Sequence, residues 1–233
     1  MLTISGFQKA LEYWQLFLQG VVCTVSLSAL TVVLGFILAL VLATCRMGRS
    51  RILRAVSTAY VELFRATPMV VQVFIIFYVV FDGIKVLPGF KLFGFIRFER
   101  FFPAVVALAL NSGAYLSEII RSGIQSIDGG QTEAARSLGL SSWKTMRFIV
   151  LPQAIKNILP AIANEFVTII KESAICYTIG VQDIMSAVNA VKGATYKMGE
   201  ALIIATVLYF CLTFPTSKII AHFERKMSRG DKR

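Results

Sequence analysis

The sequence predicts an all-α, polytopic membrane protein with about five transmembrane helices, its N-terminus outside and its C-terminus inside. Hydrophobic residues make up 56% of the 233 residues and charged residues only 16%, a composition typical of integral membrane proteins. Long apolar stretches alternate with short polar segments, and basic residues gather at the ends of the stretches. The net charge of +11 therefore indicates membrane topology rather than a nucleic-acid partner.

The first expected span lies within residues 13–45, which carry no charge. This stretch exceeds the roughly 20 residues that cross a bilayer. A basic cluster follows at once, and such a cluster marks the cytoplasmic side of a membrane. Its members are Arg46, Arg49, Arg51 and Arg54.

Residues 56–81 form the second expected span. Glu62 and Arg65 stand three residues apart and can pair on one helix face. Pro68 lacks a backbone donor and disfavours helical geometry at Thr67, so a break or kink is expected there. Such a break would leave free carbonyls inside the bundle.

Three further spans are expected at residues 101–120, 158–180 and 200–220. The segment 82–100 contains glycines and a proline and is expected to be an external loop. Residues 181–199 are expected to form an outer segment that is partly helical. The tail after the last span is basic, which places the C-terminus inside.

A polar loop at residues 128–160 separates the third and fourth spans and carries a spaced motif. Glu133-Ala134-Ala135, Gly139 and Ile149-Val150-Leu151-Pro152 together read E-A-A-x3-G-x9-I-x-L-P. We expect two short helices, the first at about 131–138 and ended by a left-handed Gly139. Ser141 or Ser142 is expected to cap the second helix. The loop is interpreted as a docking socket for another protein, against the alternative of an ordinary helical hairpin.

With this motif, the sequence resembles the permeases of ABC importers, specifically those of the polar amino acid family (histidine, glutamine, arginine and cystine). Residues 61–72, VELFRATPMVVQ, and residues 130–179 also resemble that family. The resemblance implies a type I importer permease, with residues 1–233 as a single transmembrane domain and a cytoplasmic coupling loop at about 123–157. The residues that it assigns to coupling with an ATPase are Glu133, Ala134, Ala135, Gly139, Leu151 and Pro152.

The resemblance also implies the partners of the chain. ABC ATPase subunits would hold ATP and magnesium, and this chain would bind no cofactor and no metal. The other expected partners are an extracytoplasmic substrate-binding protein, a second permease copy or homologous permease, an amino-acid substrate and membrane lipid. Nucleic acid is not an expected partner. The expected location is the bacterial plasma membrane. The sequence carries no G-x-x-x-x-G-K-[ST] phosphate loop and a single histidine, so no enzyme activity is expected in this chain.

Ionisable and amide side chains inside the expected spans are the candidates for the substrate pathway, because such residues are costly in a membrane and usually face a cavity or one another. They are Arg65, Thr67, Gln72, Asn111, Glu118, Glu165, Lys171 and Glu172. Structural roles stay open for several: an ion pair of Glu62 with Arg65, a structural pairing of Glu172 with Glu165 or Lys171, and interhelical hydrogen bonds for Gln72 and Asn111. An ion-coupled secondary amino-acid transporter and a membrane scaffold are the alternative functions, and the identity of the amino acid stays open.

Overall fold

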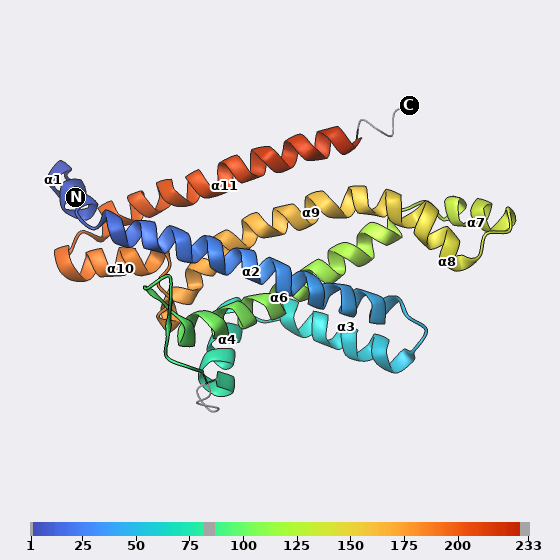
Figure 1. Cartoon of the computed structure of the whole chain (residues 1–233), viewed down its shortest axis with the longest axis horizontal. Helices are drawn as coiled ribbons and strands as arrows, with labels where there is room; N and C mark the ends of the chain where they lie inside the picture. Colours follow the sequence, from blue (N-terminus) through green and yellow to red (C-terminus); the bar gives the residue numbers. More distant parts are fainter. Residues whose placement is uncertain (1, 82–86, 229–233) are drawn as a thin grey trace.

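The computed structural model describes residues 2–81 and 87–228 and is built almost entirely of helices (Figure 1), so the all-α prediction is confirmed. A π-helical stretch, Ile75–Phe81, continues α4, and a second one, Met146–Val150, joins α8 to α9. A 3-10 stretch, Ser173–Ile179, continues α9. The α-helices are α1 (Ile4–Leu11), α2 (Trp14–Met47), α3 (Arg51–Ala66), α4 (Met69–Phe74), α6 (Phe98–Gln125), α7 (Gly129–Ser137), α8 (Ser142–Thr145), α9 (Leu151–Glu172), α10 (Ile184–Thr195) and α11 (Met198–Ser228).

The number of membrane spans agrees with the prediction of about five. Among the described residues, α2, α6 and α11 are each long and apolar enough to cross a membrane, and two bent helix pairs bring the total to five if each pair is one span. Helices α1 and α10 lie at one end of the molecule, whereas α7, α8 and the C-terminal end of α11 lie toward the other (Figure 1). Which end faces the cytoplasm rests on the basic residues and stays a prediction.

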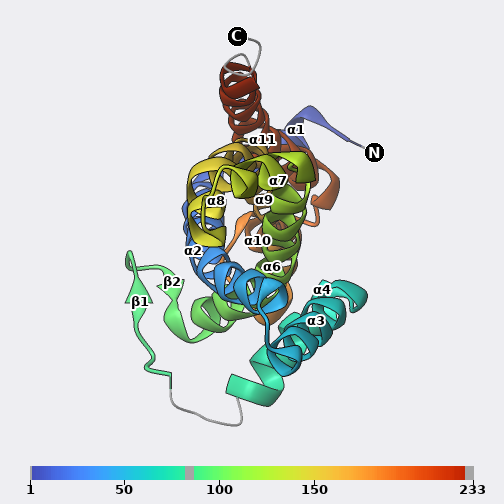
Figure 2. The ribbon, with the colours of Figure 1, turned by 90° about the vertical axis from the view of Figure 1, so that its right-hand side faces the viewer.

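Helices α2, α6 and α9 form the centre of the bundle, with the α3 and α4 pair on one side and α11 on the opposite side (Figure 2). Small residues allow the central helices to approach closely, as is common in membrane bundles. A Cβ atom added to Gly35 of α2 would lie 3.2 Å from the Cβ of Ser112 on α6. One added to Gly123 of α6 would lie 2.3 Å from Cγ1 of Ile158 on α9, so α6 and α9 nearly touch at this point.

The second expected span is broken where the proline predicted it. Helix α3 begins at Arg51, five residues before the expected start at residue 56, because Ser50 caps it by accepting a hydrogen bond from the Leu53 amide. Thr67 is extended, with φ −112° and ψ 146°, and Pro68 precedes α4. The helix axis bends by 109° between the two halves of the span. The predicted break is therefore confirmed.

The segment between the second and third spans contains a small hairpin that the sequence did not predict. Strands β1 (Lys91–Leu92) and β2 (Ile96–Arg97) pair antiparallel, with Leu92 opposite Ile96. Phe93 and Gly94 turn the chain with positive φ angles. Residues 82–86 of the expected external loop lie outside the described residues. Helix α6 extends beyond the expected 101–120 at both ends.

The helix that contains the fourth span begins much earlier than expected. It runs from Ser142 to Ile179 without a break, whereas the sequence predicted a span that starts near residue 158. Pro152 directly follows the π-helical stretch, and the chain stays helical through the proline. Gly180, with φ +81°, ends the helix, and α10 follows at an angle of 47°. The outer segment is helical as predicted.

Candidate functional site

The polar loop forms a compact two-helix unit at one end of the bundle (Figure 1). Asp128 caps α7, since its Oδ1 accepts a hydrogen bond of 2.7 Å from the Gly130 amide. Helix α7 therefore begins at Gly129, two residues before the expected start at residue 131. The first of the two expected loop helices is thus present, with a longer N-terminal turn.

Gly139 ends this helix in the left-handed conformation, as predicted. Its φ is +85°. Its amide donates to the Arg136 carbonyl at 3.0 Å, and the Leu140 amide donates to the Ala135 carbonyl at 3.1 Å. This pair of bonds is a Schellman motif, which satisfies carbonyls at the helix end and requires a positive φ. Gly139 thus fixes the corner of the loop.

Ser141 caps the second loop helix, which settles the choice that the sequence left between two serines. Its Oγ accepts a hydrogen bond from the Lys144 amide at 3.4 Å. From there the chain is helical through Leu151 and Pro152 into α9. The loop is therefore joined rigidly to the fourth span.

The motif residues divide between the exposed face of the loop and its packed face. Glu133, Ala134 and Pro152 are exposed. Ala135 is only 5% exposed, because it lies about 100° further around α7 than Ala134 and turns toward the rest of the chain. Leu151 is half-buried. Of the two alanines, only Ala134 is open to a partner.

Three apolar side chains on the loop are exposed, and the sequence analysis did not single them out as contacts. Leu138 is 83% exposed, Trp143 66% and Phe148 60%. Three large apolar side chains exposed on one short loop are candidates for contact with a partner. The available signal was the presence of large apolar residues in a segment that is otherwise polar.

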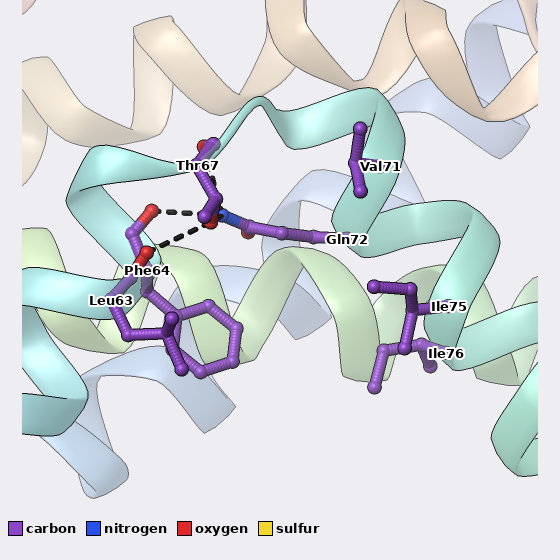
Figure 3. A pocket seen from close by; sticks show the side chains of 7 residues that line it. All are labelled: Leu63, Phe64, Thr67, Val71, Gln72, Ile75 and Ile76. Atoms are coloured by element: carbon purple, nitrogen blue, oxygen red, sulfur yellow. Dashed lines mark hydrogen bonds between the residues drawn. The ribbon is translucent and has the colours of Figure 1, made fainter.

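The break in the second span is held by one amide side chain (Figure 3). Nε2 of Gln72 donates to the carbonyl oxygens of Phe64 and Thr67, at 2.8 and 3.0 Å, and lies 2.8 Å from the Thr67 hydroxyl. Oε1 of Gln72 accepts a hydrogen bond of 2.8 Å from Nδ2 of Asn111 on α6. Gln72 and Asn111 are 6% and 5% exposed. The carbonyls that the proline frees are therefore satisfied inside the bundle.

A small pocket of about 190 Å³ lies at this break. Thr67 and Gln72 contribute its polar atoms, and the rest of the lining is apolar (Figure 3). The apolar lining comes from Leu63, Phe64, Val71, Ile75 and Ile76. With Gln72 already bonded to backbone carbonyls, the pocket offers apolar contact more than polar recognition.

Glu118 lies in an ion-pair network between α2 and α6. Its Oε2 is 2.6 Å from Nη1 of Arg46, and its Oε1 pairs with the guanidinium of Arg121. The Arg46 side chain is 12% exposed and that of Glu118 is 23% exposed.

The other charged candidates are not brought into ion pairs among the described residues. The guanidinium carbon of Arg65 lies 5.5 Å from the centre of the Tyr115 ring, so Arg65 contacts α6 by a cation–π interaction instead of pairing with Glu62. Lys171 and Glu172 are exposed at the end of α9, and Glu165 is half-buried on the same helix. Lys171 and Glu172 are thus open to contacts from outside this chain.

Comparisons with known proteins match nearly the whole chain. The family described as binding-protein-dependent transport system inner membrane component matches residues 31–229. An arginine transport system permease protein of Bacillus subtilis is 41% identical over 214 residues, which cover 92% of this chain and 93% of that protein. A nopaline transport system permease protein of Agrobacterium fabrum is 37% identical over 213 residues, covering 91% and 88%. The crystal structure of an amino acid ABC transporter with histidines matches with a TM-score of 0.87 and 38% identity, covering 97% of this chain and 100% of that chain.

Proposed function

The chain belongs to the family of binding-protein-dependent transport system inner membrane components and is a permease subunit of an amino-acid ABC importer, and we propose that its exposed α7–α8 loop couples it to a separate ATPase. Its fold is that of a type I importer permease. The observation that carries the proposal is the E-A-A-x3-G unit itself, which stands at one end of the bundle with a fixed corner at Gly139. The alternative of an ion-coupled secondary transporter is not favoured, because the matching family is named for dependence on a binding protein.

The residues of the loop support a division of roles. Glu133, Ala134 and Leu138 are exposed and would contact the ATPase, whereas Ala135 and Gly139 would keep α7 and α8 in the geometry that presents them. Leu151 and Pro152 lie where the loop enters α9 and would transmit its movement to the fourth span. The ATPase would hold ATP and magnesium and carry out the hydrolysis.

The substrate pathway would be lined by residues at the break between α3 and α4 and by residues on α6 and α9. An amino acid carries an ammonium and a carboxylate group, so its path needs complementary charges that replace water. Glu165 and Glu172 would face the ammonium, and Arg65 and Lys171 would face the carboxylate. The break residues Thr67, Gln72 and Asn111 would set the shape of the path, and Glu118 would hold α2 against α6 at its inner end by pairing with Arg46.

The complete transporter would contain more chains. A second copy of this permease or a homologous permease would complete the pathway. The exposed charged residues Lys171 and Glu172 on α9 support this proposal, because a second chain could cover them. An external binding protein would deliver the amino acid, and the assembly would sit in the lipid of a bacterial plasma membrane. Residues 1–233 would act as one domain, with residues 123–157 as its coupling loop.

Co-purification tests the coupling loop. We expect the detergent-solubilised chain, isolated from its native membrane, to bring down an ATPase that mass spectrometry identifies. Gly139→Val should lose the ATPase, because a β-branched residue is strained at φ +85° and the corner of the loop would change. Gly129→Val is the matched control: neither glycine has an atom within 4 Å of an added Cβ, but only Gly139 has a positive φ. Equal ATPase recovery with both variants would contradict the docking model.

A further inference from the structure

We propose that a groove between α2, α6 and the start of the α8–α9 helix binds an anionic phospholipid of the cytoplasmic leaflet. The inference goes beyond the transport function and does not require the loop to bind an ATPase. It requires only that this end of the bundle faces the cytoplasm, as the basic residues at the ends of the spans indicate.

The groove is apolar and has a volume of about 400 Å³. Its lining comes from the last turns of α2, from α6 and from both sides of the π-helical stretch that follows α8. Principal lining residues are Leu40, Met47, Ile120, Trp143, Met146 and Leu151. Leu40 is 45% exposed and Met47 41%, so the groove is open along α2. An acyl chain matches this chemistry and this shape.

Cationic residues adjoin lining residues of the same groove. Nη2 of Arg54 donates a hydrogen bond of 2.8 Å to the carbonyl of Gly48, a residue of the groove lining. Lys144 and Arg147 are exposed and adjoin the lining residues Trp143 and Met146 in sequence. A phosphate group beside these residues would meet guanidinium and ammonium groups from two separate helices.

The acid on α6 two residues before the lining residue Ile120 does not oppose this charge. Glu118 of α6 is already paired with Arg46 and Arg121, so its carboxylate is neutralised within the chain. The positive-inside rule explains the sign of the charges at this end. The rule does not explain why cationic residues adjoin an open apolar groove at the boundary of the span. A lipid with a charged headgroup fits this arrangement.

Trp143 provides a direct readout, because it lines the groove and is one of only two tryptophans. The full-length chain carrying Trp14→Phe is reconstituted into phosphatidylcholine vesicles that contain a minority of brominated lipid, and tryptophan quenching is measured. We expect brominated phosphatidylglycerol to quench Trp143 more strongly than brominated phosphatidylcholine, with a relative affinity higher by about fivefold for each cationic group engaged at low salt. The preference should shrink at high salt.

Variants identify the groove as the source of the preference. Arg54→Gln combined with Lys144→Gln and Arg147→Gln should bring the two lipids to equal quenching, whereas Arg54→Lys alone should keep most of the preference. Arg225→Gln, an exposed arginine near the end of α11, is the matched control and should change nothing. Equal quenching by both lipids in the unaltered groove would overturn the proposal in favour of ordinary boundary lipid. Absence of quenching by either lipid would overturn it in favour of a protein segment that covers the groove.

Discussion

At the scale of single residues, Gln72 illustrates how a membrane helix tolerates a break. Pro68 and Thr67 interrupt the backbone, and the freed carbonyls of Phe64 and Thr67 are bonded by the Gln72 amide. Asn111 completes the arrangement from α6. The polar side chain is therefore part of the backbone hydrogen bonding of the span, at a position where it is only 6% exposed.

Replacing this amide should weaken the fold. Gln72→Met keeps the approximate shape but leaves the Thr67 carbonyl without the Gln72 amide, while the Phe64 carbonyl and the Asn111 amide keep only their mutual hydrogen bond of 3.3 Å. We expect a loss of about 1–3 kcal/mol in the free energy of unfolding, measured as a lower thermal midpoint of the full chain in detergent. Gln8→Met, at an exposed amide in α1, is the control and should leave the midpoint unchanged. A midpoint unchanged in both variants would show that the break is held by other contacts.

A second prediction concerns Glu118, which was expected in the substrate pathway and which lies in an ion-pair network. Its replacement distinguishes a structural role from substrate contact. Glu118→Gln leaves Arg46, with a side chain 12% exposed, beside a neutral partner. We expect a loss of about 1–3 kcal/mol in stability, with little change in the KM for uptake by the assembled transporter. Glu62→Gln, at an exposed carboxylate on α3, should change neither. A raised KM at unaltered stability would instead assign Glu118 to substrate contact.

At the scale of elements, the turn between the fourth span and α10 depends on a single glycine. Gly180 has φ +81°, and Nη1 of Arg100 donates a hydrogen bond of 2.6 Å to the neighbouring Ile179 carbonyl. A Cβ atom on Gly180 would lie 2.5 Å from that Nη1 atom. The start of α6 thus fixes the end of the long helix from Ser142.

Gly180→Ala should therefore destabilise the chain. The left-handed backbone and the displaced Arg100 guanidinium together should cost about 1–3 kcal/mol, seen in the thermal midpoint. Gly193→Ala is the contrast, because Gly193 is helical and no atom lies within 4 Å of its added Cβ. That variant should gain about 0.5 kcal/mol from helix propensity. Equal effects from the two substitutions would contradict the assigned role of the turn.

At the scale of the whole molecule, transport should depend on other chains. Vesicles that contain only this permease should take up no radiolabelled amino acid under a sodium or proton gradient. Uptake should begin when the ATPase, the second permease subunit and the binding protein are present with ATP at the ATPase side. Gradient-driven uptake by the chain alone would contradict this and support an ion-coupled transporter.

The sequence predicted the elements better than their connections. Apolar length, Pro68 and Gly139 each have one dominant physical consequence, and the spans, the break and the loop corner follow from them. The continuous helix across Pro152 was missed, because a proline inside a helix removes a backbone donor and usually kinks or ends the helix. For Gln72, an interhelical hydrogen bond was among the alternatives left open, and Asn111 is its partner. The pairing of Glu118 with Arg46 was missed, since the two residues lie 72 positions apart in the chain. The role of each pathway candidate stays a prediction.

The unbroken helix from Ser142 to Ile179 spans about 55 Å at 1.5 Å per residue. Gly123 and Ile158 bring α6 and α9 into close contact not far from its middle. The helix can pivot at this contact, with about 24 Å of helix on the Ser142 side and about 31 Å on the Gly180 side. A tilt of about 10° would move the loop end by about 4 Å and the Gly180 end by slightly more in the opposite direction. A displacement of the loop would then produce a displacement of similar size, in the opposite direction, at the other end of the helix.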